Sequence, residues 1–171
     1  MSSLQPDDYA LQQVEIRLQV IGTPDEVTEY NVVFDAIQDE VIQGIRDAKF
    51  IIWAAVAWFS NEAIYHELLE KKKQGLNIRI IVSQEDSNTN MISKLKENKF
   101  DVVVIPRWGN REYNRMHDKF CIIDMEYVMH GSYNWTPTAN YNEETLATAL
   151  DHELVVKFAK EFMELYNGIC F

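Results

Sequence analysis

The chain has 171 residues, 47% of them hydrophobic, and a formal net charge of −11 at pH 7. This length fits one domain and the hydrophobic content is enough for a core, which excludes an intrinsically disordered chain. Two cysteines are too few for a disulfide framework, and Cys121 lies in an apolar run, so we expect a buried free thiol in a reducing compartment.

The first half of the chain predicts strands alternating with helices. Residues 1–8 have neither the basic start nor the apolar segment of a signal peptide. Apolar and polar residues alternate over 13–20, which predicts a half-buried strand, and apolar residues four apart predict a helix over 29–47. The next expected elements are a buried strand at 50–58, a helix capped by Ser60 and stopped by Gly75, a strand at 78–82, a helix at 88–99 and a strand at 102–105.

The second half changes character. The expected elements are a polar aromatic loop at 107–114, strands at 116–123 and 127–129 joined by a tight turn, a loop at 135–142, a strand at 145–150 and a final helix capped by Asp151. Together these predict a single α/β layered domain over 1–171, with a mostly parallel central sheet flanked by helices and an extra N-terminal strand near 13–20. The longest apolar run, 50–59, is too short to span a bilayer, so we expect a cytoplasmic protein with no membrane partner.

The charge is unevenly distributed along the chain. Residues 91–119 carry seven lysines or arginines against four acidic residues, a local charge of +3, whereas the rest carries −14. A net negative charge disfavours a nucleic-acid partner, but this basic segment leads directly into the motif described next. Lys94, Lys96 and Lys99 can equally solvate the last turn of a helix and complement its dipole.

One pattern, H-x-K-x4-D-x6-G-S-x-N, fixes six residue types over eighteen positions. Its members are His117, Lys119, Asp124, Gly131, Ser132 and Asn134. His117 and Lys119 are two apart on a predicted strand, so both side chains leave the same face. An imidazole can attack phosphorus or exchange protons near neutral pH, and a lysine ammonium suits a phosphate oxygen. A lone histidine on a strand is usually structural, but a lysine on the same face favours a phosphate-handling site.

The second segment of the pattern follows a predicted strand. Gly131 allows the backbone to approach a ligand closely, and Ser132 and Asn134 offer a hydroxyl and an amide on one side. Alone, such residues are ordinary turn formers, so their spacing from His117 carries the interpretation. The pattern occurs once, so chemistry that needs two such histidines requires two chains.

This pattern resembles the defining motif of the phospholipase D superfamily, with no substituted position. The resemblance is greatest to the short members with a single motif, the bacterial Nuc-type nucleases and the Zucchini-type mitochondrial relatives. It covers most of the chain and implies a phospholipase D-like fold. Residues 13–20 are the part without a place in a minimal member of the family.

The resemblance implies a two-step displacement in which His117 attacks a phosphodiester and forms a phosphohistidine. The equivalent histidine of a second subunit would protonate the leaving alcohol and then activate water. Lys119, Ser132 and Asn134 of both chains would hold the charge on the phosphoryl oxygens, with no metal or other cofactor.

The resemblance also implies roles for two acidic positions. In the family, an acid shortly after the motif, in an N-x-E arrangement, orients the histidine. In this chain the matching position is Glu144, and Glu143 is the alternative. Asp124 is expected to be a structural hydrogen-bonding residue rather than a phosphate ligand.

The loops beside the motif are rich in aromatic and basic side chains. These could stack on bases and bind phosphates of single-stranded nucleic acid. Alternatively, the loop aromatics cover the sheet edge or fill a dimer seam. The predicted substrate-binding residues are Arg107, Trp108, Arg111, Arg115 and Trp135, with Tyr113 and Tyr133 beside them. The aromatic residues expected in the core instead are Trp53, Trp58 and Tyr127.

No metal site is expected, because the four histidines lack ligand spacing and neither cysteine has a partner cysteine nearby. A Mg²⁺-type cluster could be assembled only from Asp118, Asp124, Glu143 and Glu144, and the complete lysine-containing motif argues against it.

These observations predict a homodimeric, metal-independent phosphodiesterase that acts on DNA or RNA as an endonuclease. One alternative is a lipid-directed phosphodiesterase, which the lack of an amphipathic membrane helix in the sequence disfavours. Another is a non-catalytic dimer that binds nucleic acid within a larger complex, against which the intact set of His117, Lys119 and Asn134 counts. An acidic chain could also depend on a protein partner, as in a toxin or defence assembly.

Overall fold

The computed structural model describes residues 28–107 and 114–168. Its strands are β1 (Glu29–Val33), β2 (Ile51–Val56), β3 (Asn77–Ser83), β4 (Asp101–Ile105), β5 (Lys119–Ile123), β6 (Tyr127–Gly131) and β7 (Leu146–Leu150). Its helices are α2 (Ile37–Asp47), α3 (Glu62–Lys73), α4 (Thr89–Glu97) and α5 (His152–Asn167), with short 3₁₀ helices η1 (Asp86–Asn88) and η2 (Pro137–Tyr141). The predicted strand at 13–20 lies outside the described residues.

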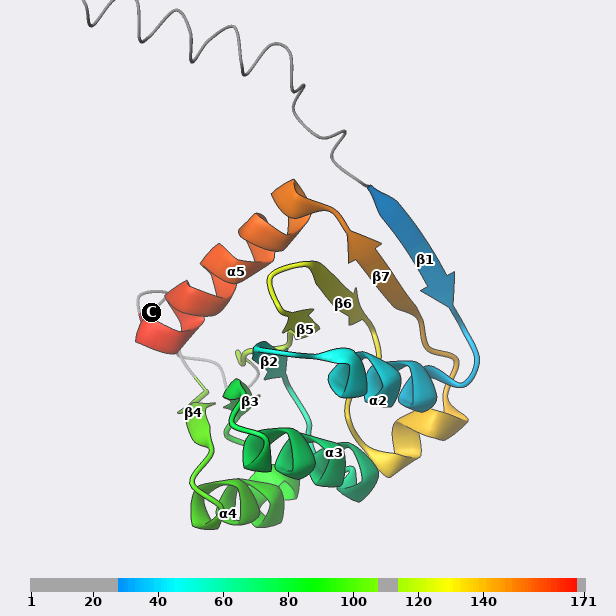
Figure 1. The fold of residues 1–171 in the computed structure, drawn as a ribbon. Helices are drawn as coiled ribbons and strands as arrows, with labels where there is room; N and C mark the ends of the chain where they lie inside the picture. The colour runs from blue at the N-terminus through cyan, green and yellow to red at the C-terminus, as the bar shows by residue number, and fades with distance from the viewer. Residues whose placement is uncertain (1–27, 108–113, 169–171) are drawn as a thin grey trace, which may run out of the picture.

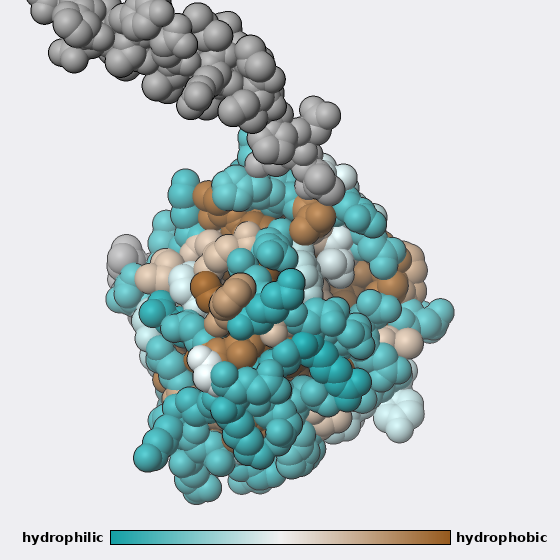
Figure 2. All heavy atoms as spheres, viewed as in Figure 1, coloured by the Kyte–Doolittle hydropathy of each residue, from teal (hydrophilic) through white to brown (hydrophobic). Residues whose placement is uncertain are grey.

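The strands form one sheet in the order β1-β7-β6-β5-β2-β3-β4. Helices α2, α3 and α4 cover one face and α5 covers the other (Figure 1), and each face has its own cluster of buried apolar side chains. In the same view, the surface over α3 and α4 is mainly hydrophilic (Figure 2), as expected for helices that bury only an inner stripe. The single α/β domain with flanking helices is confirmed.

The expectation of a mostly parallel sheet is wrong, because the sheet is mixed. Only β2, β3 and β4 run parallel, joined through the crossover helices α3 and α4. All other neighbouring strands are antiparallel. The tight turn after β5 places Asp124 and Met125 at φ of 53° and 59°, which returns β6 directly alongside β5.

Residues 29–33 form an edge strand and not the first turns of the helix predicted over 29–47. β1 pairs with β7 in antiparallel register, from Glu29 opposite Leu150 to Val33 opposite Leu146. Helix α2 begins only at Ile37, after Ala36 adopts a left-handed φ of 50°. Pairing with a distant strand, which local periodicity does not report, decides the structure of this segment.

Most of the predicted helix ends are confirmed. Asp151 caps α5 by accepting from the Leu154 amide, and Gly75, at φ 91°, follows the end of α3. The cap of α3 is Asn61 rather than Ser60, because the Asn61 carboxamide accepts from the amides of residues 63 and 64. Cys121 is a buried free thiol, as predicted, and its burial raises the pKa of the thiol well above its usual range.

The ends of four strands bring the two parts of the motif to the same end of the sheet. Lys119, the first residue of β5, pairs with Val56, the last of β2. Gly131, the last residue of β6, pairs with Leu146, the first of β7. The residues that precede β5 and follow β6 therefore emerge side by side.

Candidate active site

His117 and Lys119 lie together, as their spacing predicts. The Lys119 ammonium is 3.1 Å from Nδ1 of His117 and donates to the His117 carbonyl oxygen at 2.6 Å. His117 itself lies just before β5, and the neighbouring Asp118 carbonyl accepts from the Ala57 amide, which extends the pairing of β5 with β2. The side chains of His117 and Lys119 therefore share one side of the chain.

The surroundings of His117 favour the neutral imidazole. Partial burial of the ring and the positive charges of Lys119 and Arg115 lower its pKa, against an opposing effect of Asp118. Burial also lowers the pKa of Lys119, while the carboxylates of Asp118 and Glu144 oppose that shift. A neutral imidazole is the form that can attack phosphorus.

Gly131 is required by the protein's own backbone. A Cβ atom at this position would lie 2.0 Å from the Thr145 carbonyl oxygen. The glycine thus permits close approach to the neighbouring segment, and its closeness to a ligand stays a prediction. The following Ser132 is fixed to the same segment, because its amide donates to the Thr145 oxygen at 3.1 Å.

Glu144 is the acid that lies beside the motif. Its carboxylate accepts from the Ser132 hydroxyl and, at 3.3 Å, from the side-chain amide of Asn142. The Ser132 oxygen in turn accepts from the Thr145 amide at 3.0 Å. Glu143 lines a different cavity, described below, so Glu144 is the better candidate for the acid that orients the histidine. The role of Glu144 in orienting His117 stays a prediction, since the contact made in this structure is with Ser132.

Asp124 has the structural role that was expected and lies at the far end of β5 from His117. Its carboxylate accepts from the backbone amides of Lys49, Phe50 and Ile51, each at 2.7 Å. These bonds tie the β5–β6 turn to the start of β2. Asp124 therefore does not belong with the phosphate-handling residues.

The predicted substrate-binding rim is only partly described. Trp108 and Arg111, and Tyr113 beside them, lie outside the described residues. The guanidinium groups of Arg107 and Arg115 lie 2.6 Å and 3.4 Å from the carboxylate of Glu85, whose side chain is only 7% exposed. Both arginines are thus held near the site by an internal ion pair.

The assignment of Trp135 to a stacking rim is wrong. Trp135 is 3% exposed and meets Phe59 edge-on, with ring centroids 5.2 Å apart. Its carbonyl oxygen accepts from the amides of Ser60 and Asn61. Tyr133 is buried as well. These two loop aromatics belong to the core rather than to a stacking rim, because the backbone beside Trp135 folds onto the start of α3.

Trp58 was expected in the core and lies at the site instead. Its ring meets the imidazole of His117 edge-on at 5.1 Å between centroids, and the cationic groups of Lys119 and Arg115 each lie 5.7 Å from the ring. No local pattern in the sequence signals this contact, because it depends on the pairing of β2 with β5, in which Val56, the last residue of β2, lies opposite Lys119.

A neutral cleft adjoins these residues. It has a volume of about 360 Å³, and its lining consists of Trp58, Ser60, Ser87, Asn134, Thr136, Pro137, Thr138, Ala139 and Asn142. The Oδ1 atom of Asn134 is buried and has no hydrogen-bond partner among the described residues. The cleft thus joins the motif asparagine to the tryptophan that contacts His117.

Residues 28–107 and 114–168 contain neither a cluster of metal-ligand side chains nor a membrane-spanning helix. No group of three or more His, Cys, Asp or Glu side chains is placed to hold a metal ion in this part of the chain. None of the helices described there is both long and apolar enough to cross a bilayer.

Comparison with known proteins identifies the family. The family model described as "Cardiolipin synthase, PLD-like domain" matches residues 41–166. Protein FAM83B of Homo sapiens is 22% identical over 147 residues, 78% of this chain and 14% of that protein. The mitochondrial cardiolipin hydrolase of Chlamydomonas reinhardtii is 29% identical over 109 residues, 63% of this chain and 48% of that protein. The chain therefore spans less than half the length of either relative.

A solved structure has the same fold. The phospholipase D family member Nuc from Salmonella typhimurium superposes with a TM-score of 0.72 at 19% identity, over 82% of this chain and 95% of that chain. The resemblance that the motif suggested is thus supported by the family match over most of the chain and by the fold. The chain belongs to the PLD-like domain family.

Proposed function

We propose that this protein is a metal-independent phosphodiesterase that cleaves nucleic acid as an endonuclease through a phosphohistidine. The observation that carries the proposal is the pairing of His117 with Lys119, in which a neutral imidazole adjoins a cation suited to a phosphate oxygen. Ser132 and Asn134 emerge at the same end of the sheet. Membership of the PLD-like family and the fold shared with Nuc support this chemistry.

The active unit we propose is a homodimer in the cytoplasm. The motif occurs once in the chain, so the second histidine that protonates the leaving alcohol comes from a second copy. Water activated by that histidine then releases the product from His117.

The test is a cleavage panel with single-stranded DNA, duplex DNA and RNA in excess EDTA. We expect cleavage that persists on chelation, and loss of cleavage with EDTA would remove the metal-free mechanism. His117→Ala should abolish turnover, whereas the matched variant His66→Ala, an exposed histidine on α3, should keep it. Rapid quenching in alkaline denaturant, with ³²P at the scissile phosphate, should trap a label on the wild-type chain only, and this label should be stable in base and released by acid. A monomer by light scattering at assay concentration would contradict the shared site.

A second candidate is a phosphodiesterase that cleaves lipid headgroups. The names of the matching family and of the algal relative, which refer to cardiolipin, favour it. Cardiolipin vesicles added to the same panel separate the two candidates, because phosphatidic acid release without nuclease activity would support the lipid enzyme. Nucleic-acid binding without cleavage of any substrate, by wild type and His117→Ala alike, would instead support a non-catalytic binding module that works with a partner protein.

A further inference from the structure

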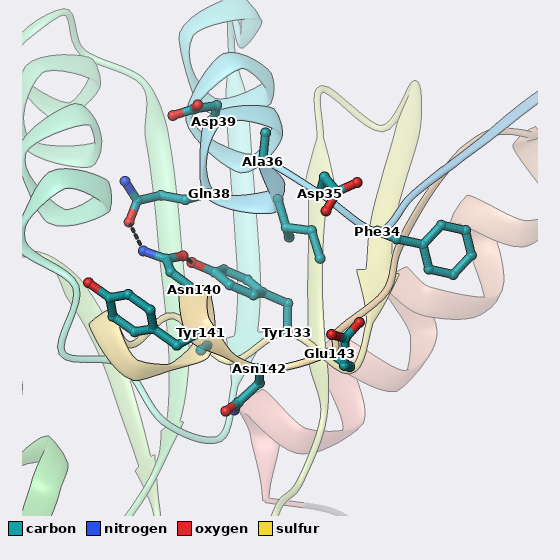
Figure 3. Close-up of a pocket in the computed structure, with 12 residues that line it drawn as sticks. Phe34, Asp35, Ala36, Gln38, Asp39, Tyr133, Asn140, Tyr141, Asn142 and Glu143 are labelled. Atoms are coloured by element: carbon teal, nitrogen blue, oxygen red, sulfur yellow. Dashed lines mark hydrogen bonds between the residues drawn. The ribbon is translucent and has the colours of Figure 1, made fainter.

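A cavity of about 370 Å³ lies between the start of α2 and the loop that follows β6 (Figure 3). Its lining consists of Phe34, Asp35, Ala36, Ile37, Gln38, Asp39, Tyr133, Ala139, Asn140, Tyr141, Asn142 and Glu143. This volume lies within the range of small-ligand sites. The lining contains three carboxylates, of Asp35, Asp39 and Glu143, and neither lysine nor arginine.

Several polar groups in the wall of this cavity are already paired with one another. The Tyr133 hydroxyl donates to Oδ1 of Asn140 at 2.6 Å, and the Asn140 amide donates to Oε1 of Gln38 at 2.8 Å, a bond drawn in Figure 3. The same Gln38 oxygen accepts from Asn61 at 2.6 Å. These bonds use the Tyr133 and Asn140 donors within the protein, whereas the carboxylates remain as acceptors. A ligand that pairs with these carboxylates must donate hydrogen bonds.

The lining includes two exposed aromatic side chains. Tyr141 is 90% exposed and Phe34 is 64% exposed. Figure 3 shows their rings on opposite sides of the lining residues. Aromatic faces beside carboxylates attract a cation, through the ring quadrupole as well as through charge. A planar guanidinium suits both, because it stacks on rings and pairs with carboxylates.

This cavity is unsuited to the phosphates of a substrate. Its carboxylates repel a polyanion, and burial together with the charges of Glu144 and Asp39 raises the pKa of Tyr133 to about 12. It nonetheless borders the neutral cleft beside Trp58 and Asn134, since Ala139 and Asn142 line both hollows.

We propose that this cavity binds an arginine side chain from a basic segment of a partner protein. The four described arginines of a second copy are poor sources, because each already lies beside a carboxylate of its own chain. These ion pairs are Arg46 with Glu67, Arg79 with Asp101, and Arg107 and Arg115 with Glu85. The proposal is independent of the phosphodiesterase activity, since none of its residues belongs to the His117–Lys119 pair.

The experiment is a titration of ¹⁵N-labelled full-length protein with acetyl-Gly-Arg-Gly-amide at physiological salt. Amide shifts should change at 34–39 and 139–143, and the peptide with citrulline in place of arginine should produce no comparable change. Asp39→Asn should weaken binding by about five- to tenfold. Its matched control is Glu40→Gln, an equal change of charge on the same helical turn by a residue that does not line the cavity, and this variant should bind like wild type.

Tyr141→Ala carries the test if Asp39→Asn fails to fold, because its side chain is almost fully exposed. Phe50→Ala, also an exposed aromatic but remote from the cavity, is its control. Equal binding of the citrulline peptide, shifts that map elsewhere, or equal losses in the test and control variants would overturn the proposal. So would spermidine binding as tightly as the peptide, which would indicate a small amine as the ligand. Shifts at these residues on concentrating the protein alone would indicate a second copy instead.

Discussion

The indole ring of Trp58 stands at 85° to the imidazole of His117, with their centroids 5.1 Å apart. The same ring lies beside the cationic groups of Lys119 and Arg115. Trp58, which follows β2, thus covers the His117 ring and contacts the two cationic side chains that lower its pKa. Burial is the largest cause of the lowered His117 pKa, and Trp58 is one of the side chains that cover the ring.

Replacing Trp58 by alanine should raise the His117 pKa toward its ordinary value of 6.5, because the imidazole becomes better hydrated. A neutral nucleophile loses activity as the pH falls through its folded-state pKa, so the acid limb of kcat/KM should move to higher pH. NMR titration of the imidazole and the pH profile of cleavage measure the two effects. Trp53→Phe, which alters a ring packed on Phe162, should change neither. An unshifted His117 pKa in folded Trp58→Ala would contradict the shielding role.

Asn88 holds the backbone on both sides of Trp58. Its amide donates to the carbonyl oxygens of Ala57 and Ser83 at 2.8 Å, and its Oδ1 accepts from the Phe59 amide at 2.9 Å. Asn88→Ala leaves these buried groups unpaired and should lower the free energy of unfolding by about 3 kcal/mol, measured by urea denaturation. The exposed Asn90→Ala is the control and should change stability little. Wild-type stability in Asn88→Ala would show that water replaces the side chain without cost.

Asp124→Ala should lower the free energy of unfolding by about 3 kcal/mol at neutral pH, because three backbone amides lose a charged acceptor. Burial raises the pKa of Asp124, but these amides lower it more, so the net shift is downward from 3.8. The stabilisation is therefore present above the unfolded-state pKa and is lost as the pH falls through the folded-state value. Urea denaturation of wild type and Asp124→Ala should show that their difference in free energy of unfolding is smaller at strongly acidic pH than at neutral pH. Glu126→Ala, in the same turn, should show no such pH-dependent difference.

Gly131→Ala should destabilise the protein by at least about 3 kcal/mol, because the new methyl group would lie 2.0 Å from a backbone carbonyl of Thr145 that cannot move freely. Thermal unfolding measures the loss. Gly75→Asn is the comparison, because Gly75 has a φ of 91° and open space around it. A side chain at this position destabilises the protein only through backbone conformation and not through a clash. A melting temperature for Gly131→Ala at or above that of Gly75→Asn would mean that β6 and β7 separate easily at this point.

Some of the site was predictable because it depends on local spacing. The two-residue interval between His117 and Lys119 determines that they share a side, whichever strand lies next to them. Asp124 as a structural hydrogen-bonding residue followed from the family motif. The predictions placed Trp58 in the core and Trp135 at the rim, and the structure has them the other way round. Burial depends on which segments pack against each indole.

The sequence by itself determined the family motif, the face shared by His117 and Lys119, and the end signals at Gly75 and Asp151. These depend on residue identity and on backbone periods of a few residues. Only the tertiary structure decided that the sheet is mixed, that residues 29–33 join it as an edge strand, and that Trp58 contacts His117. Strand pairing and side-chain burial arise from contacts between segments far apart in the chain, and no local pattern encodes which segments meet.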